Sequence, residues 1–244
     1  MSYTDIHSHI LFGVDDGARD IAESERMLDY ALRENISTVI LTPHFGLSNP
    51  GYKRETAEKN FTILKELQEQ KYPDMKLFMG NELLWSKGII DSLKNGESQT
   101  LCDTQYILVE FFTDVSFGEM EDAISEFVWN GYFPIIAHAE RYDCMKNSPE
   151  MVRNIIKCGA YIQVNNRGFT IIKKHFKTKR KNEWAESLLK QNLIHFLASD
   201  CHNDTTRNPL YEAVMRDVKG ICGESAFNTI VSGNTDSLIR NKKI

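Results

Sequence analysis

Short apolar runs alternate along the chain with longer segments whose apolar residues recur at helical spacing. The short runs are rich in β-branched and aliphatic residues, and most are bounded by turn residues, which is typical of β-strands. Seven such runs read TDIHSH (4–9), TVILTPH (38–44), MKLFMGNELL (75–84), YILVEFF (106–112), FPIIAHAE (133–140), AYIQVNN (160–166) and IHFLASD (194–200). The pattern predicts about seven strand–helix units.

Two of the intervening segments have clear helical signals. In the first, Met120, Ala123, Ile124, Phe127 and Val128 form one apolar stripe, and Gly131 follows as a stop. The second begins with an N-cap, a first-turn proline and an acid, which are Ser148, Pro149 and Glu150, and its buried face would be Val152, Ile155 and Ile156 before Gly159. Segments 52–70 and 179–192, rich in Lys and Glu, predict solvated helices, and 205–244 predicts terminal helices.

The alternation of strands and helices indicates an α/β fold with a parallel sheet. Runs such as TVILT and YILV are apolar throughout, which suits strands covered on both faces. No polar linker, low-complexity tract or internal repeat divides the chain, so residues 1–244 are expected to form a single domain, a barrel of about seven βα units. A doubly wound open sheet is the alternative, but HSHILFGVDDG after the first strand lacks its usual GxGxxG turn.

Composition narrows the possible partners. The 244 residues are 41% hydrophobic and carry a formal net charge of -5, which argues against nucleic acid or an anionic membrane as the main partner. The start lacks a signal peptide pattern and no uncharged run of 18 residues occurs, so we expect a cytoplasmic protein without membrane insertion. Five scattered cysteines without a CxxC pair fit reduced thiols.

Ligating side chains collect where the predicted strands end. They are His7, His9, His44, Glu82, Glu110, His138, Asp200 and His202. In a parallel barrel all these ends form one rim, where catalytic residues gather. His175 and His195 are expected to be structural instead. Five histidines with several acids at one rim predict a metal site.

The ordered motifs DIHSH, TPH, the Glu of GNE, AHAER and SDCH resemble those of the PHP metallophosphoesterases. That resemblance implies a distorted (β/α)7 TIM-like barrel, the PHP fold, with a trinuclear metal site. HSHILFGVDDGA, the Glu of VEF, the Arg of AHAERY and SDCHN resemble in particular the CpsB-like manganese-dependent protein tyrosine phosphatases of bacterial capsule and exopolysaccharide operons. Many other PHP relatives have His where this chain has Asp16 and Glu110, which favours the CpsB-like branch.

The resemblance implies three groups of metal ligands. His7, His9, Glu82 and Asp200 would hold one metal; Glu82 would bridge to a second, completed by Glu110 and His138; Asp16, His44 and His202 would hold the third. Asp15 is the less favoured member of the Asp pair. Imidazole and carboxylate ligands without thiolate suit Mn, Fe or Zn, and the resemblance selects three divalent ions, most simply Mn.

The same resemblance implies a mechanism and a partner. A water that bridges the metals would attack phosphorus, while Arg141 and Arg207 would bind the phosphate oxygens and act as catalytic residues. Three divalent ions exceed the charge of four carboxylate ligands by about two units, which would let an acidic protein bind an acidic substrate. The expected partner is the phosphotyrosine-containing tail of a bacterial tyrosine kinase, and the sequence leaves the oligomeric state open.

Cys201 and Arg207 raise a rival interpretation, because CHNDTTR has the C-x5-R spacing of cysteine-dependent tyrosine phosphatases. That loop normally contains glycine and excludes acids, so that its thiol titrates low. Here it lacks glycine and contains Asp204, while Asp200 precedes the cysteine. Strand alternation also points Cys201 away from the side that Asp200 and His202 share, so we interpret the spacing as a coincidence.

Other functions stay open at this point. A histidinol-phosphate or other small-molecule phosphomonoesterase is the nearest enzymatic alternative, and a non-catalytic protein that docks a kinase is an alternative of another class. Four aromatic residues near the ends of motifs either pack or line an aromatic-accepting mouth; they are Phe12, Phe45, Trp85 and Phe112.

Overall fold

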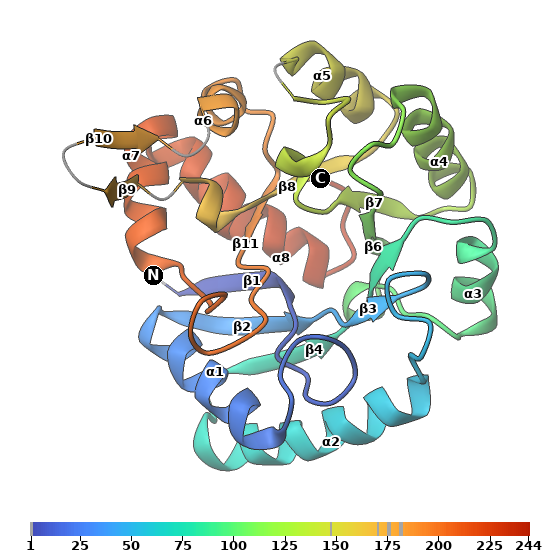
Figure 1. Ribbon diagram of the computed structural model, residues 1–244, viewed down its shortest axis with the longest axis vertical. Coiled ribbons are helices and arrows are strands. Elements are labelled where there is room, and N and C mark those ends of the chain that lie inside the picture. Colours follow the sequence, from blue (N-terminus) through green and yellow to red (C-terminus); the bar gives the residue numbers. More distant parts are fainter. Residues whose placement is uncertain (1, 147, 170, 175–176, 181–182) are drawn as a thin grey trace.

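Strands and helices alternate in the computed structural model, which describes residues 2–146, 148–169, 171–174, 177–180 and 183–244 (Figure 1). The strands are β1 (Tyr3–Ser8), β2 (Ile36–Leu41), β3 (His44–Phe45), β4 (Lys76–Met79), β5 (Glu82–Leu84), β6 (Tyr106–Glu110), β7 (Phe133–Ile136), β8 (Tyr161–Asn165), β9 (Ile171–Lys174), β10 (Lys177–Arg180) and β11 (Phe196–Ala198). The helices are α1 (Ile21–Arg33), α2 (Arg54–Lys71), α3 (Ile89–Asn95), α4 (Phe117–Trp129), α5 (Pro149–Lys157), α6 (Glu183–Lys190), α7 (Glu212–Asn228) and α8 (Asn234–Ile239).

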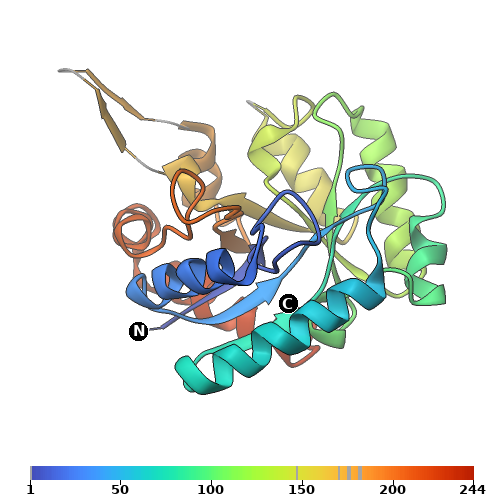
Figure 2. The same ribbon diagram turned by 60° about the horizontal axis from the view of Figure 1, so that its bottom comes forward.

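Two parallel sheets make up the wall of a distorted barrel. One has the strand order β1-β2-β4 and the other the order β11-β8-β7-β6-β5-β3. They meet on one side where β2 runs into β3 and β4 into β5, and on the other side through a parallel bridge between Ser8 and Cys201. Helices surround the strands (Figures 1 and 2). This confirms the predicted α/β barrel.

Two predicted strands are each interrupted shortly before a site residue. TVILTPH divides into β2 and β3 at Pro43, and MKLFMGNELL divides into β4 and β5 at Gly80. Proline has no N–H to donate to a neighbouring strand. At Gly80 a Cβ would lie 2.6 Å from a methyl carbon of Leu101, so the chain passes too close for a side chain. His44 and Glu82 therefore begin short strands, where they pair in register, instead of ending long ones.

Inward-facing positions along three strands change from apolar to polar toward the carboxyl ends. The series are Tyr106–Leu108–Glu110 on β6, Tyr161–Gln163–Asn165 on β8 and Phe196–Ala198–Asp200 through β11. Their lower members pack in one buried cluster with Ile6, Ile40 and Leu238. Intervening residues such as Ile107, Val109 and Leu197 join the larger core beneath the outer helices. The barrel is thus filled from below by side chains, which leaves the polar groups at its upper rim.

The predicted helices are confirmed except at one end. In α4 Met120, Ala123, Ile124 and Phe127 are buried, while Val128 is 41% exposed. In α5 Ser148 accepts a hydrogen bond from the backbone N–H of Met151, as expected of an N-cap. The segment 179–192 is helical only from Glu183, because residues 177–180 pair with β9 as an antiparallel strand. Within the described residues no helix combines the length and apolar character needed to cross a membrane.

His195 is a structural residue, as expected, while His175 lies outside the described residues. The Nδ1 atom of His195 accepts a hydrogen bond from the backbone N–H of Ile162 at 3.1 Å, and its ring packs edge-on against Tyr161. Burial lowers the pKa of His195 to about 4. The imidazole is therefore neutral in the folded protein at pH 7.

We predict that this histidine makes the protein less stable in acid. The pKa of His195 is about 6.5 in the unfolded chain and about 4 in the folded protein, so between these pH values only the unfolded chain binds the proton. The free energy of unfolding therefore falls as pH drops from 6.5 to 4, by at most about 3 kcal/mol. In the His195→Asn variant an amide oxygen can replace Nδ1 as acceptor without titrating. Urea unfolding at several pH values should show a shallower acid slope for the variant, and equal slopes would contradict the assignment.

Candidate metal centre

His7 and His9 lie at the end of β1 with their Nε2 atoms 3.3 Å apart. In both histidines the second ring nitrogen, Nδ1, contacts a residue outside the centre. Nδ1 of His7 lies 3.2 Å from the side-chain oxygen of Gln163, and Nδ1 of His9 lies 2.7 Å from Asp15. Both rings therefore direct Nε2 toward the centre, in the way that outer hydrogen bonds orient metal-binding histidines.

The two aspartates after β1 face different groups. Asp15 is enclosed and accepts hydrogen bonds from the ring of His9 and from the backbone N–H groups of Gly17 and His44. Asp16 has a side chain that is 66% exposed and lies 3.5–3.6 Å from the Nε2 atoms of His44 and His202. The turn requires Gly17, because a Cβ there would lie 2.1 Å from the carbonyl oxygen of His9. Asp15 orients a histidine, and Asp16 faces two histidines from the solvent side of the centre.

Glu82 is fully buried and stands among four imidazoles. Its Oε1 lies 2.8 Å from His138 Nε2, and its Oε2 lies between 3.0 and 3.3 Å from a ring nitrogen of each of the other three, which are His7, His9 and His44. Burial alone would raise the pKa of Glu82, but the neighbouring histidines outweigh it and hold that pKa well below its usual range. The carboxylate is therefore ionised inside the protein.

Glu110 and His138 complete the side of the centre nearest β6 and β7. Nε2 of His138 lies 3.3 Å from Oε1 of Glu110, and His44 Nδ1 lies 3.7 Å from its Oε2. Burial lowers the pKa of His138, yet hydrogen bonds to Glu110 and Glu82 outweigh it and raise that pKa to about 9. The Tyr142 hydroxyl lies 3.4 Å from the remaining ring nitrogen, Nδ1, of His138.

Asp200 joins the centre to two arginines. Its Oδ1 lies 3.6 Å from Nε2 of both His7 and His9, and it accepts a hydrogen bond from Arg207 at 2.9 Å. Its Oδ2 pairs with Arg141. Asp200 also has a positive φ of 50°, a conformation that costs energy in residues other than glycine and is concentrated at functional sites. A cavity of about 280 Å³ opens beside this pair of arginines.

Three groups of ligand atoms come close enough to share a metal ion. Within each group one potential ligand atom per residue lies within 4.8 Å of the others; the groups are His7–His9–Glu82, His44–Glu82–Glu110 and His9–Asp16–His44–His202. Seven of the nine expected metal-ligating residues belong to these groups. The other two, His138 and Asp200, lie beside them, in contact with Glu82 and with His7 and His9 respectively. The groups therefore differ from the implied sets: His44 takes the place of His138 beside Glu82 and Glu110, and Asp200 is missing from the group of His7, His9 and Glu82.

Two buried polar atoms of the centre fit a cation. Oε2 of Glu82 and Nδ1 of His44 make no hydrogen bond within the described part of the chain, although they lie 3.0 Å apart. A buried ionised oxygen without a donor is costly, and a divalent ion between such atoms removes that cost. A donor set of imidazole and carboxylate without thiolate is suited to Mn, Fe or Zn.

Sequence reasoning missed the residues that support the centre. Gln163 accepts hydrogen bonds from both His7 and the backbone N–H of His138, and Asn165 donates to Asp200 at 2.8 Å. Both are polar residues at alternate positions in AYIQVNN, the run of β8. An alternation of polar side chains within an otherwise apolar strand is the signal that could have identified them.

Cys201 does not have the surroundings of a nucleophile. Its side chain is fully buried in the core beneath the outer helices, on the side opposite Asp200. Burial, with the nearby charge of Asp5, raises the pKa of the Cys201 thiol, so the thiolate is suppressed at neutral pH. The geometry opposes the rival interpretation of CHNDTTR.

The chain is similar to known tyrosine phosphatases over almost its whole length. The chain is 32% identical to tyrosine-protein phosphatase CpsB of Streptococcus agalactiae over 98% of this chain and 99% of that protein. It is 33% identical to tyrosine-protein phosphatase YwqE of Bacillus subtilis over 98% of this chain and 92% of that protein. A solved chain among crystal structures of YwqE and Streptococcus pneumoniae CpsB, described as unique metal-dependent tyrosine phosphatases, superposes with a TM-score of 0.88 at 30% identity, covering 99% and 96% of the two chains.

A more distant structure shares the fold alone. The phosphotriesterase homology protein of Escherichia coli superposes with a TM-score of 0.58 at 11% identity, covering 97% of this chain and 98% of that one. The model of the capsular polysaccharide synthesis family CpsB/CapC, by contrast, matches residues 3–240. With that match over almost its whole length, the chain belongs to the CpsB/CapC family.

Proposed function

We propose that this protein hydrolyses phosphotyrosine on a protein substrate in a metal-dependent reaction. The observation that carries the proposal is the ionised, buried Glu82 among four imidazoles, with Asp200 and two arginines beside it. A structural role alone does not account for so many ligating groups at one rim. The names of the CpsB and YwqE relatives support phosphotyrosine as the substrate.

The centre would hold three divalent ions, with Mn as the most suitable identity. The proposed ligands are His7, His9, Asp16, His44, Glu82, Glu110, His138, Asp200 and His202. Such ions supply Lewis acidity and a water that is activated at neutral pH. Asp15 and Gln163 fix the rings of His9 and His7, so that little reorganisation is needed when ions bind.

Arg141 and Arg207 would bind the phosphate of the substrate. Each guanidinium carries several N–H groups in one plane and can donate to two phosphate oxygens. Both already converge on Asp200, which holds them at the rim of the centre. Charge that develops on the phosphate and on the leaving phenolate oxygen is thereby stabilised by groups that need not move far.

The proposed partner is the phosphotyrosine-containing tail of a bacterial tyrosine kinase that regulates capsule or exopolysaccharide synthesis. The CpsB/CapC match supports this setting. We further propose that residues 1–244 act as a single domain of the PHP type and that the reaction takes place in the cytoplasm. A formal net charge of -5 is consistent with a protein substrate and not with nucleic acid.

Removal of metal should abolish turnover. We expect the purified protein to release phosphate from a phosphotyrosyl peptide, to lose this activity after exhaustive chelation and to recover it when Mn is restored. The Glu82→Gln variant keeps the side-chain volume but removes the charge, so its metal content should fall together with its activity. Glu97→Gln, at an exposed position, serves as control. Activity indifferent to chelation would rule the metal reaction out.

Loss of an arginine should weaken catalysis more than folding. Arg141→Ala and Arg207→Ala are each expected to lower kcat/KM by roughly 10²–10³-fold, because each removes a cationic donor from the phosphate site. Arg33→Ala, at an exposed position at the end of α1, should leave kcat/KM unchanged. Unfolding in urea shows whether a loss reflects destabilisation. Full activity in both site variants would place the phosphate elsewhere.

Replacement of Cys201 should leave the reaction intact. We expect Cys201→Ala to retain kcat/KM within about twofold, while the lost packing of the buried sulfur lowers stability by about 1 kcal/mol. The assay uses the same phosphotyrosyl peptide, with thermal unfolding as the second readout. An inactive but folded Cys201→Ala protein would contradict this expectation and support a mechanism with Cys201 as the nucleophile.

A further inference from the structure

A groove of about 580 Å³ lies directly beyond three residues of the candidate metal centre. Each of these three is followed within three positions by a residue that lines the groove; the pairs are His44 and Leu47, Glu82 and Trp85, and Glu110 and Phe112. Hydrogen bonding joins the two regions as well, because the backbone N–H of Trp85 donates to the carbonyl oxygen of Glu110 at 2.8 Å. We call this feature the Trp85 groove and define it by Leu47, Trp85, Phe112, Asp114, Glu119 and Glu126.

The floor of the Trp85 groove is apolar and partly exposed. Trp85 is half-buried and packs edge-to-face on Phe127, with the ring centroids 5.1 Å apart. Phe112 is 57% exposed and Leu47 is 62% exposed. Exposed apolar side chains that gather beside a site of chemistry mark a surface that binds a ligand or a partner. By contrast, Phe45 packs against Tyr52 and Phe12 joins the core, so neither belongs to the groove.

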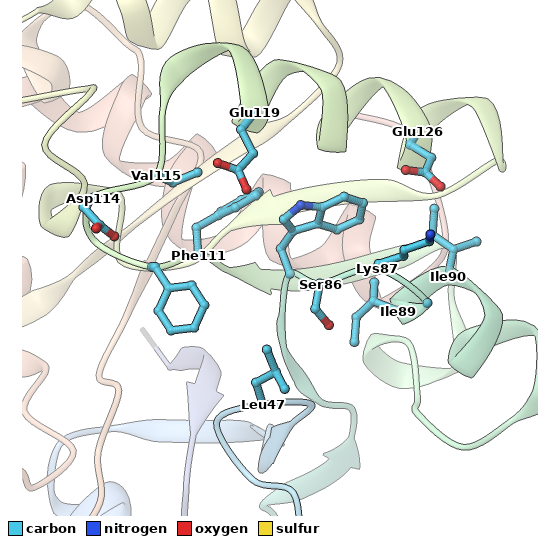
Figure 3. A pocket seen from close by; sticks show the side chains of 13 residues that line it. Leu47, Ser86, Lys87, Ile89, Ile90, Phe111, Asp114, Val115, Glu119 and Glu126 are labelled. Carbon is cyan, nitrogen blue, oxygen red and sulfur yellow. The ribbon is translucent and has the colours of Figure 1, made fainter.

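The wall of the Trp85 groove is acidic. Figure 3 shows Glu119 and Glu126 on α4 along one side, with Leu47 on the opposite side. Asp114 adds a third carboxylate, and Lys87 is the single cationic side chain that lines the groove in the described structure. None of these three carboxylates forms an ion pair with another described residue. The unpaired charges therefore remain available to an occupant with basic side chains.

We propose that the Trp85 groove binds the polypeptide segment that flanks the phosphotyrosine. It selects segments that carry an apolar and a basic side chain next to the phosphotyrosine. This inference rests on the proposed function. The phosphate and its ring would occupy the metal centre, and the flanking residues would lie over Phe112 and Leu47 with a Lys or Arg facing Glu119. The groove thereby favours a protein substrate over a small phosphate ester.

Steady-state kinetics on two matched phosphotyrosyl peptides test the inference. One peptide carries Leu and Lys in the positions next to the phosphotyrosine, and the other carries Ser and Glu in the same positions. We expect a KM roughly five- to tenfold lower for the Leu/Lys peptide, with similar kcat, because apolar contact and partly exposed ion pairs each contribute modestly. p-Nitrophenyl phosphate, which has no flanking residues, reports on the centre alone.

Variants of the groove separate its role from that of the centre. Phe112→Ala and the double variant Glu119→Lys/Glu126→Lys should each raise KM for the Leu/Lys peptide, and the double variant should improve the Ser/Glu peptide. Neither should change kcat/KM for p-nitrophenyl phosphate. The matched controls are Trp129→Ala, 87% exposed at the end of α4, and Asp74→Lys in the exposed turn before β4. Both controls should behave as wild type toward both peptides.

Several outcomes would overturn the inference. Equal KM values for the two peptides in the wild-type protein would show that the residues flanking the phosphotyrosine do not contribute to binding. Groove variants that alter the oligomeric mass but not the KM would assign the groove to a second copy of the chain. If the wild-type protein hydrolyses neither peptide nor p-nitrophenyl phosphate, the proposed function itself fails, and the groove proposal falls with it. Turnover without peptide preference overturns the groove proposal alone.

Discussion

The buried carboxylate of Glu82 is the constraint on which the rest of the centre depends. A fully buried, ionised group is tolerated only when positive charge or donors surround it, and here four imidazoles from the ends of β1 and β7 and from β3 do so. Those imidazoles need carboxylate and amide partners of their own, which Asp15 and Gln163 provide. The buried charge of Glu82 thus requires a first layer of imidazoles and a second layer of polar partners. This explains why polar residues occupy the upper positions of otherwise apolar strands.

Two features of the barrel position these polar groups: an apolar layer beneath them and breaks in two of the strands. Apolar inward-facing residues fill the lower part, so the polar layer rests on a packed support and not on solvent. Pro43 and Gly80 interrupt two strands at the same level, and the register of the pair is unchanged across the break, with Leu41 opposite Met79 and His44 opposite Glu82. What changes is the sheet, because β5 also pairs with β6, whereas β4 ends the three-stranded sheet. The break therefore brings Glu82 into the same sheet as Glu110.

Sequence patterns predicted the fold class, the runs that form the wall of the barrel and the residues that converge at its rim, because strand ends and apolar alternation are local signals. They missed the strand breaks, since TVILTPH and MKLFMGNELL read as continuous until the close approach at Gly80 is known. They also missed Gln163 and Asn165, whose value lies in contacts with His7 and Asp200, far away along the chain. The antiparallel pairing of residues 177–180 was hidden by a composition that also suits a helix.

The bridge between Ser8 and Cys201 has a consequence for biosynthesis. It joins the first strand to the segment after the last strand of the barrel, and the ligating residues extend from His7 to His202. A nascent chain emerging from the ribosome therefore carries its first histidines long before Asp200 and His202 exist to complete their surroundings. Long-range closure of this kind comes late in folding. The two edges of the barrel wall can therefore pair only after residues 200–202 have been synthesised, whereas neighbours such as β6 and β7 can pair much earlier.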